Sequence, residues 1–460
     1  MKIPLFCALV LAGCTKPNPA VCCLDQADCS EVGLDEIRTC SAGLACVEHQ
    51  CEVPSCSTTG CMANAPVCNI TTDVCDPCTD SSQCTRFADS PVCESTSGSC
   101  VGCVDASDCA GTRPICDMNA CRACRADTEC PSGACGTDGA CVPENDVLYL
   151  SATGTNAGTC SRAQPCKSLA YGVGQAGGSR THIVLSPGSY SETNISISSQ
   201  TTAATSIQIH GHGAGFSQLS GEGSIIGTVL PLLVRDLEFS SLIGGGGEGL
   251  NLAGGGGHRI ENVTVRGGNN GLVVMTGVAV RNLHAIDCRA GILLAGGSLD
   301  LDGGVFERGQ FAITTFAVSS ATISNVLAWG AEQLAFDFSS VQGVASFVTV
   351  ADSGTNSGAG PRAVACSQDF VIRSSIIWAP GSTARVPVDG CSLVSTIAGP
   401  TPVAGASNDD PRFVNAGAHD YHLAGNSPAK DAVDTGPATD FEGDARPRGI
   451  RFDIGADEAP

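Results

Sequence analysis

Short apolar runs recur at a fixed interval between residues 258 and 338. The repeating units begin at IENVTV (260–265), VRNLHA (280–285), LDGGVF (301–306) and ISNVLA (323–328). Their third residues are 20, 21 and 22 positions apart. A second apolar run starts nine residues after each third residue, at GLVV (271–274), GILL (291–294), AIT (312–314) and LAF (334–336). Two short strands per turn at this period predict a solenoid whose coils stack on one another.

Alternation inside each unit predicts which side chains face the solenoid interior. In IENVTV, we expect Ile260 and either Val263 or Val265 to point inward, and Glu261 and Thr264 to point outward.

One position of the repeat carries asparagine in three units out of four. These residues are Asn262, Asn282 and Asn325, and Gly303 occupies the position in the remaining unit. Amides that repeat at one turn can form a ladder of hydrogen bonds between coils. The alternative is ordinary turn chemistry, because asparagine tolerates left-handed dihedral angles.

Composition supports an all-β protein with more than one domain. A chain of 460 residues is too long for one compact core, and its 57 glycines and 4% aromatic residues suit many short strands. The net charge of −22 comes without a basic stripe, which excludes a nucleic-acid-binding role. The acidic surface gives solubility and a weak capacity for divalent cations. We expect a monomer with no cofactor, calcium being a candidate that no motif supports.

The N-terminus has the features of an export signal. Residues 1–13 contain one lysine and an apolar run that is too short to span a membrane. The tetrad LAGC (11–14) resembles a bacterial lipobox, which implies lipidation of Cys14 and a lipidated tether over residues 14–21. Thr15 follows where aspartate would imply inner-membrane retention, so the resemblance implies the outer membrane, at the cell surface or on the periplasmic face. An ordinary cleaved signal is the alternative.

Residues 22–141 hold 22 of the 29 cysteines. They recur in groups of four joined by C-x2-C, with an acidic residue shortly before the second cysteine of the later groups (Asp80, Asp108 and Glu129). An exported chain favours disulfides over zinc, although the connectivity stays open. The pattern resembles the cysteine-rich repeats of secreted and surface proteins from myxobacteria and related soil bacteria. That resemblance implies a spacer or an interaction module.

The stretch 146–404 begins with a recognisable opening. Residues 147–192 contain a strand, the segment PCKS (165–168), a short amphipathic helix from Leu169 to about Gln175, a second strand and the turn SPGSY (186–190). This order resembles the opening of right-handed parallel β-helix proteins of the pectate-lyase-like superfamily. In that superfamily the helix caps the open end of the solenoid.

Five cysteines belong to this stretch. We expect Cys160 to pair with Cys166 and Cys366 to pair with Cys391, which leaves Cys288 as a buried free thiol.

The C-terminal segment 405–460 carries DPRF (410–413), DYHL (420–423), SPAKD (427–431) and DIGADE (453–458) in order. These blocks resemble the choice-of-anchor Q region that follows β-helix repeats in bacterial surface proteins. We expect a cap that covers the final coil. Asp440 is expected to pair with Arg446, and Asp453 and Glu458 are expected to accept hydrogen bonds from turn amides.

Candidate catalytic residues are few. Hydrolases of the superfamily need paired carboxylates, and lyases need a Lys or Arg base, often with calcium. Asp300 and Asp302 alternate onto one strand face with Glu307 close behind, and Arg266, His284 and Arg289 lie on neighbouring coils. No catalytic series of the enzyme families is recognisable, so solvated coil surface is the first expectation, ahead of glycan contacts and catalysis.

His210 and His212 can share one strand face and are candidate metal ligands. The alternative is a pair of histidines that are exposed or already hydrogen-bonded.

The sequence therefore favours a lipid-anchored surface protein that binds glycans or neighbouring envelope material without catalysis. A polysaccharide lyase or glycoside hydrolase is the first alternative, and a purely structural envelope protein is the second, because this fold does not fix function.

Overall fold

The computed structural model describes residues 23, 29, 37, 39–40, 45–47, 49–52, 56, 60–221, 224–240, 247–317, 319–354, 362–367, 369–379 and 386–460. Cys14 and the expected signal peptide and tether lie outside these residues. The chain forms two compact units, one of Met1–Arg125 with Gly136–Cys141 and the other of Ala126–Cys135 with Val142–Pro460. The segment Ala126–Cys135 thus groups with the second unit, although the sequence places it inside the cysteine-rich stretch. No helix within the described ranges is long and apolar enough to cross a bilayer.

The first unit consists of small antiparallel hairpins held by disulfides. The hairpins pair β1 (Ala45–Val47) with β2 (Gln50–Glu52), β3 (Val67–Asn69) with β4 (Val74–Asp76), β5 (Val92–Glu94) with β6 (Ser99–Val101), and β7 (Ile115–Asp117) with β8 (Ala120–Arg122). Short 3-10 turns occur in both units: η1 (Ser81–Cys84) and η2 (Ala106–Asp108) lie in the first, and η3 (Asp127–Glu129), η4 (Glu144–Asp146) and η5 (Ala416–Ala418) lie in the second.

Three successive groups of four cysteines share one connectivity, in which the first bonds to the third and the second to the fourth. The pairs are Cys56–Cys68, Cys61–Cys75, Cys78–Cys93, Cys84–Cys100, Cys103–Cys116 and Cys109–Cys121. Each bond closes a loop of 12 to 16 residues, which stabilises the folded chain by about 3 kcal/mol. These bonds compensate for a segment with few large apolar side chains.

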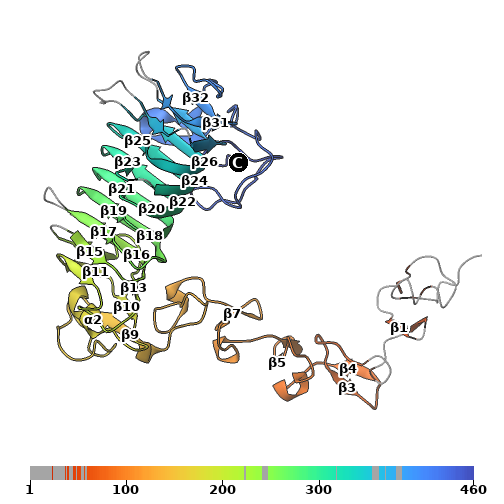
Figure 1. Cartoon of the computed structure of the whole chain (residues 1–460). Coiled ribbons are helices and arrows are strands. Elements are labelled where there is room, and N and C mark those ends of the chain that lie inside the picture. Colours follow the sequence, from red (N-terminus) through yellow and green to blue (C-terminus); the bar gives the residue numbers. More distant parts are fainter. Residues whose placement is uncertain are drawn as a thin grey trace, which may run out of the picture. The chain divides into compact units, whose positions relative to one another are not determined.

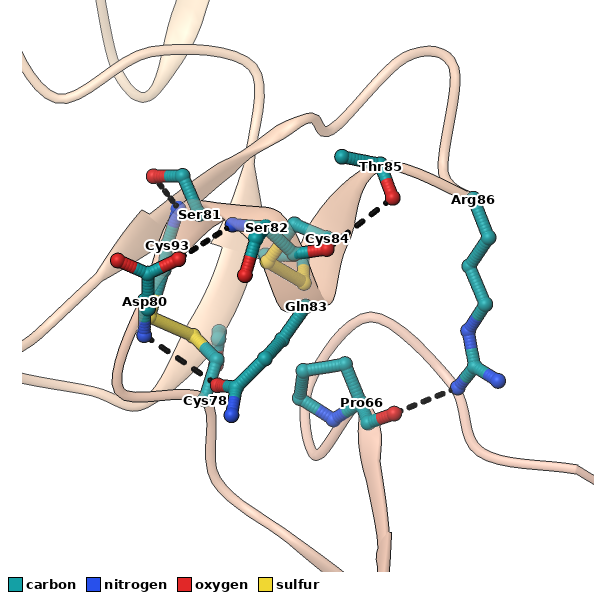
Figure 2. The surroundings of a disulfide bond; sticks show 12 residues. Pro66, Cys78, Asp80, Ser81, Ser82, Gln83, Cys84, Thr85, Arg86 and Cys93 are labelled. Carbon is teal, nitrogen blue, oxygen red and sulfur yellow. Dashed lines mark hydrogen bonds between the residues drawn. A yellow bond between two sulfur atoms is a disulfide. The ribbon is translucent and has the colours of Figure 1, made fainter.

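The acidic residues that recur before the second cysteine stabilise turns. Figure 2 shows Asp80 at the start of η1, where its carboxylate accepts a hydrogen bond from the Ser82 amide and Gln83 Oε1 accepts one from the Asp80 amide. Asp108 and Glu129 occupy the position of Gln83 in the next two turns and accept backbone N–H groups there. These side chains therefore act as caps.

The second unit is a parallel β-helix, which confirms the predicted fold class (Figure 1). Its larger sheet contains β9 (Val147–Leu150), β10 (His182–Leu185), β11 (Gly188–Ser191), β13 (Ile207–His210), β14 (Ser217–Ser220), β16 (Leu232–Ser240), β18 (His258–Arg266), β20 (Val278–Ile286), β22 (Ser298–Glu307), β24 (Ser319–Trp329), β26 (Val341–Ala351), β28 (Phe370–Arg373), β29 (Ile376–Trp378), β31 (Ser392–Val394) and β32 (Ile397–Gly399). The smaller sheet contains β12 (Ile195–Ile197), β15 (Ser224–Thr228), β17 (Glu248–Leu252), β19 (Asn270–Val274), β21 (Ala290–Leu294), β23 (Phe311–Thr315), β25 (Leu334–Phe338), β27 (Val364–Cys366) and β30 (Val388–Asp389).

One residue near the middle of each long strand has a left-handed backbone conformation and bends the strand. Its φ is 54° at Asp236, 52° at Asn262, 55° at Asn282, 76° at Gly303, 55° at Asn325 and 53° at Phe347. The strand before the bend pairs with one set of neighbours and the strand after it with another: β16 pairs with β13 through residues 232–235 and with β14 through residues 238–240. Each coil therefore has three faces.

The asparagines at this bend form hydrogen bonds along the solenoid. Asn262 Nδ2 donates to Asp236 Oδ1 at 3.0 Å, and Asn282 Nδ2 donates to Asn262 Oδ1 at 3.1 Å. Gly303 interrupts the series, and Asn325 donates instead to Asp302 Oδ1 at 2.9 Å. The asparagines therefore combine the two interpretations made from the sequence. They are turn residues with left-handed dihedral angles, and their side chains also link neighbouring coils.

The interior is filled by aliphatic residues from all three faces and by stacked rings. Ile260, Val263 and Val265 are all buried, because the bend at position 262 lets both valines face inward. Phe338 stacks on Phe370 with ring centroids 4.2 Å apart.

A helix closes the first coil, as the sequence predicts. Helix α2 spans Leu169–Gln175, with the Ser168 hydroxyl accepting a hydrogen bond from the Tyr171 amide at its start. Leu169 and Val173 are buried against the first coils. The disulfide Cys160–Cys166 secures the preceding loop, and Cys366–Cys391 links two later coils.

The segment Ala126–Cys135, here called the strap, covers the outer face of the first coils. Ala134 and the nearby Val142 pack against Val147, Tyr149 and Val184 on β9 and β10. The all-buried sequence VLYL (147–150) reflects this cover, since both faces of β9 are shielded from solvent.

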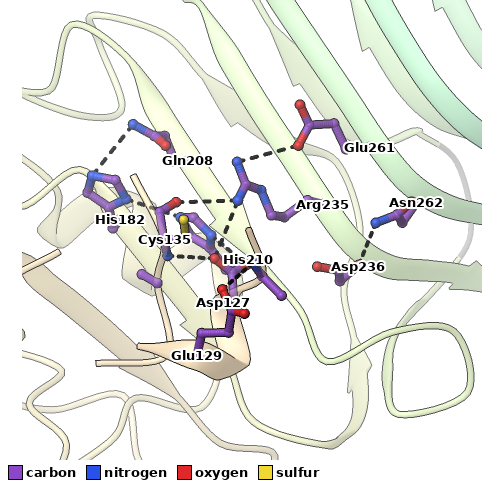
Figure 3. Close-up of polar contacts among 12 residues, drawn as sticks. Asp127, Glu129, Cys135, His182, Gln208, His210, Arg235, Asp236, Glu261 and Asn262 are labelled. Atoms are coloured by element: carbon purple, nitrogen blue, oxygen red, sulfur yellow. Dashed lines mark hydrogen bonds and ion pairs between the residues drawn. The ribbon is translucent and has the colours of Figure 1, made fainter. Parts of the chain in front are cut away.

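A buried chain of polar groups holds the strap in place (Figure 3). Asp127 accepts hydrogen bonds from the Cys135 amide at 2.7 Å and from His210 Nδ1 at 2.9 Å. The second nitrogen of His210, Nε2, lies 3.1 Å from His182 Nδ1. Arg235 Nη1 lies 3.5 Å from the same carboxylate and donates to the Cys135 carbonyl. Because these groups are buried, their mutual pairing offsets the cost of removing them from water.

The C-terminal segment packs on the outer face of the last coils. Strands β33 (Phe413–Asn415) and β34 (Asp420–Leu423) form a hairpin. Leu327 and Trp329 on β24 contact Tyr421 and Ala456 of this segment. The segment covers a side of several coils and includes the final coil, where Ile397 on β32 packs against it, because apolar residues there face outward.

The interior of this cap contains one buried arginine. Arg446 donates to the carbonyls of Asp453, Gly455 and Ala456 and lies 3.3 Å from Glu458 Oε2. The predicted partner, Asp440, instead accepts backbone amides, including that of Glu458. Asp453 and Glu458 accept turn amides as expected.

We expect the polar network beneath the strap to make the protein less stable in acid. Burial is the main cause that lowers the pKa of His182 to about 4 from its ordinary 6.5. The unfolded chain therefore takes up a proton before the folded chain does. The free energy of unfolding should fall as the pH drops from about 6.5 towards 4, by up to about 3 kcal/mol for this residue. Urea unfolding at both ends of this range measures the change. His182→Gln should reduce it, and an equal loss in variant and wild type would contradict the assignment.

We expect substitutions of two neighbouring arginines in the cap to change stability by unequal amounts. Arg446→Leu removes the ion-pair partner of buried Glu458 and a donor to three carbonyls, and should lower the free energy of unfolding by about 3–5 kcal/mol. Arg448→Ala removes a half-exposed pair with Asp444 and should cost less than about 1 kcal/mol. Urea unfolding compares the two variants. Similar small losses in both would show that the Arg446 network contributes little.

Candidate functional site

The two aspartates selected from the sequence lie on β22 before its bend at Gly303. Asp300 pairs with Arg281 Nη2 at 2.6 Å. Asp302 accepts hydrogen bonds from Ser324 at 2.7 Å and from Asn325 at 2.9 Å. Both point outward from one strand face, as predicted, but each is already hydrogen-bonded within the solenoid.

His284 and Glu307 lie after the bend, on the adjacent face. His284 Nε2 is 2.6 Å from Glu307 Oε1, and the second carboxylate oxygen of Glu307 is 3.3 Å from Arg308 Nη1. Arg308 also forms a two-bond pair with Asp287 at 2.6 and 2.9 Å. The structure brings these residues together and separates them from Asp300 and Asp302.

The two remaining arginine candidates also have polar partners. Arg266 Nε lies 3.5 Å from Glu238 Oε1, and Arg289 Nη1 donates to Asn269 at 3.4 Å. Arg266 and Arg289 therefore help to join neighbouring coils.

The ion pairs on these two faces of the solenoid hold the paired side chains in their charged forms, which makes them poor general acids and bases. The hydrogen bond to Asp287 raises the pKa of Arg308, and the same bond lowers the pKa of Asp287. The hydrogen bond to Asp300 raises the pKa of Arg281. A lyase base must be able to lose its proton, and a glycosidase acid must be able to hold one. These three groups are therefore poorly suited to either role.

The histidine pair does not form a metal site. His210 is buried between Asp127 and His182. His212 lies beyond the end of β13, and its Nδ1 is 2.8 Å from the Leu185 carbonyl oxygen. The two rings have separate partners, which supports the alternative that these histidines are hydrogen-bonded within the fold.

Cys288 is a buried free thiol. Burial raises its pKa to about 12, and its sulfur lies 3.3 Å from the Gly267 carbonyl oxygen. A thiol that stays protonated and inaccessible is a poor nucleophile.

A concave site lies where the strap meets the first coils. This cavity, here called the Arg162 cavity, has a volume of about 370 Å³, within the range of small-molecule sites. Its lining residues are Thr128, Cys130, Pro131, Ser132, Gly133, Tyr149, Arg162, Pro165, Val184, Ser186 and His212. Four hydroxyl-bearing side chains (Thr128, Ser132, Tyr149 and Ser186), one imidazole and one guanidinium thus line it, and none of these residues carries a carboxylate.

Arg162 is fixed within the cavity by the neighbouring residues. Its guanidinium carbon lies 4.7 Å above the centre of the Tyr149 ring. Its Nη2 donates to the Pro131 carbonyl and to the Tyr149 hydroxyl, and the Tyr149 hydroxyl donates to the Ser132 carbonyl. The Glu144 carboxylate lies 3.4 Å from Nε. The guanidinium is therefore oriented before any ligand arrives.

Sequence reasoning missed this cavity because its residues come from the strap, from strands β9 and β10 and from three loops. The available signal was VLYL (147–150), an apolar run whose outward residues require a covering segment. Nothing in the sequence indicates that the cover leaves a hollow beside Arg162.

Comparisons with known proteins are sparse. No protein-family model matches this chain, and no curated protein sequence matches it. Among solved structures it is similar to the "Crystal structure of pectate lyase Pel9A", with 12% sequence identity and a TM-score of 0.42. That alignment covers 68% of this chain and 96% of the other. At this identity and TM-score the similarity indicates nothing about activity or substrate.

Proposed function

We propose that this protein is a non-catalytic, glycan-binding lipoprotein of the cell surface. We further propose that the Arg162 cavity binds a sugar unit that carries a carboxylate. The observation that carries the proposal is the lining of this cavity, which combines Arg162 and His212 with four hydroxyl-bearing side chains and contains no acidic residue.

Arg162 supplies the charge recognition. A guanidinium donates strong, charge-assisted hydrogen bonds to a carboxylate. Nη2 and Nε have partners, whereas Nη1 forms no hydrogen bond with any residue that the structure describes. Because Tyr149 and Pro131 already orient the group, little side-chain entropy is lost on binding.

The hydroxyl groups suit the rest of a sugar. Thr128 and Ser186 each offer a donor and an acceptor, whereas the hydroxyl of Ser132 donates to the Ala134 carbonyl. A ring with several hydroxyls needs both kinds of partner around its edge. The proline and valine side chains in the lining offer apolar contact for the ring carbons.

The charge of the chain limits the length of the ligand. With a net charge of −22, the protein repels an extended polyanion at low ionic strength. A single acidic unit or a chain end can reach the cavity with less repulsion. We therefore favour an isolated or terminal uronate over a continuous polyuronate.

Two features favour binding over catalysis. The lining has no pair of carboxylates for hydrolysis. The solenoid residues selected as catalytic candidates are engaged in ion pairs and hydrogen bonds with neighbouring coils.

The cavity predicts a specific loss of binding. Titration calorimetry of the full chain should show binding to uronate-bearing oligosaccharides from pectin, alginate and glycosaminoglycans, and weaker binding to neutral ones. Arg162→Gln should weaken it by about 10- to 100-fold, since a charge-assisted hydrogen bond is lost. Arg259→Gln removes an equal charge from an exposed arginine on β18 and should leave binding unchanged.

The same oligosaccharides should be assayed for new reducing ends and unsaturated products. Binding without products supports the proposal. Products whose formation stops with Arg266→Ala or Asp302→Asn would establish the enzymatic alternative. Neither binding nor products would favour a structural envelope role.

The lipobox predicts membrane attachment through Cys14. The acyl chains on this residue stabilise membrane association by about 0.8 kcal/mol per buried methylene. Cys14→Ser should move the protein from the membrane fraction to the soluble fraction, as judged by fractionation and labelling with a radioactive fatty acid. Retention of the variant in membranes would place the anchor elsewhere.

A further inference from the structure

Three side chains with metal-binding atoms converge in the C-terminal cap, away from the Arg162 cavity. Nε2 or Nδ1 of His422 and one carboxylate oxygen each of Glu442 and Asp457 lie within 4.8 Å of one another. His422 Nε2 is 2.9 Å from Glu442 Oε2. We propose that these residues bind a divalent transition-metal ion, with Zn²⁺ as the best match to one imidazole and two carboxylates.

The orientation of His422 is the first argument. Its Nδ1 lies 2.6 Å from Asp420 Oδ1, which leaves Nε2 directed at Glu442. Histidine ligands of metals typically donate their second nitrogen to a carboxylate, which fixes the ring and strengthens the ligand. Asp420 is thus placed as the residue that positions the histidine.

The state of Asp457 is the second argument. This residue is only 6% exposed, and its Oδ2 accepts the Leu423 amide at 2.7 Å. Its Oδ1 has no hydrogen-bond partner among the residues that the structure describes. This oxygen is therefore open to a further ligand, and a cation beside it would offset the cost of burying the rest of the carboxylate.

Glu442 is held in position by the backbone. Asp440 Oδ1 accepts the amides of Glu442 and Asp444, which forms a tight turn, and Asp440 Oδ2 accepts the Glu458 amide. Arg446 and Arg448 form their ion pairs with Glu458 and Asp444. These two arginines are therefore committed to other carboxylates.

The geometry suits a small ion. Ligand atoms about 2.0–2.2 Å from zinc in a tetrahedral site lie roughly 3.4 Å apart. The present 2.9 Å between His422 Nε2 and Glu442 Oε2 requires only a small adjustment of two half-exposed side chains. Water would complete the coordination. The ion would join β34, the turn at 440–444 and residues 453–458, so its role would be structural.

Other clusters of potential ligands are accounted for. The remaining groups of this kind in the described part of the chain are cysteine triplets, and all of those cysteines form disulfides. In the oxidised protein these cysteines are not available as metal ligands, so metal binding can be tested at the cap alone.

The test is calorimetry with Zn²⁺ on the full, oxidised chain after removal of metals with a chelator. One equivalent should bind, and thermal unfolding should shift upward by several degrees. Glu442→Gln and Asp457→Asn should each weaken binding about 100-fold or abolish it. Asp420→Asn should weaken it about 10-fold, as expected for a residue that orients a ligand.

A matched control is Asp434→Asn, which alters an exposed aspartate of the same cap that pairs with Arg451. It should leave both the affinity and the thermal shift unchanged. The proposal fails if no stoichiometric binding occurs, or if Glu442→Gln and Asp457→Asn bind as the wild type does. Either result would leave His422 as a protonated bridge between Asp420 and Glu442. Because Glu442 is half exposed, its variant is expected to fold, and circular dichroism verifies this.

Discussion

The solenoid depends on the alignment of one bend per coil. Each long strand turns at a residue with positive φ, and inter-coil hydrogen bonds on both sides of that residue form only when successive bends coincide. A slip of one residue would exchange inward and outward side chains. The Asp236–Asn262–Asn282 bonds reinforce this alignment at the bend itself. Gly303 keeps the bend without the side-chain bond, because glycine adopts this conformation at little cost.

Those parts of the fold that repeat could be predicted from the sequence. The period, the inward residues, the bend asparagines and the closing helix follow from local patterns that recur or from an opening segment with its own signature. The Arg446 pairing could not be predicted, because it depends on which carboxylate the folded loops bring near. Asp440 is closer along the chain, yet Glu458 lies in reach of the guanidinium. One sequence signal did indicate that the cap packs on the side of the solenoid. The run VLAW (326–329) has no polar residue at its outward positions, so another segment must cover them.

The candidate site was less predictable for a related reason. In the sequence, charged residues on successive coils resemble a set of catalytic residues. In the folded solenoid, parallel stacking places residues of opposite charge next to each other, and they form ion pairs. His284 with Glu307 and Arg281 with Asp300 are such cases. The Arg162 cavity has no local pattern at all, since the strap and the first coils create it jointly. Pairing and concavity both arise from tertiary contacts that periodicity does not encode.

Among the described residues, the strap makes its apolar contacts with β9 and β10, and the cap makes its apolar contacts with β24 and later strands. Strands β18, β20 and β22 lie between these two regions. These three strands share one register and bury matching interior positions, such as Ile260, Val280 and Leu301. A whole coil added or removed there would leave every strap and cap contact intact. Such a change alters the length of the solenoid by about 4.8 Å, the spacing of adjacent strands. The two ends are thus separated by an adjustable spacer whose length is set by the number of middle coils.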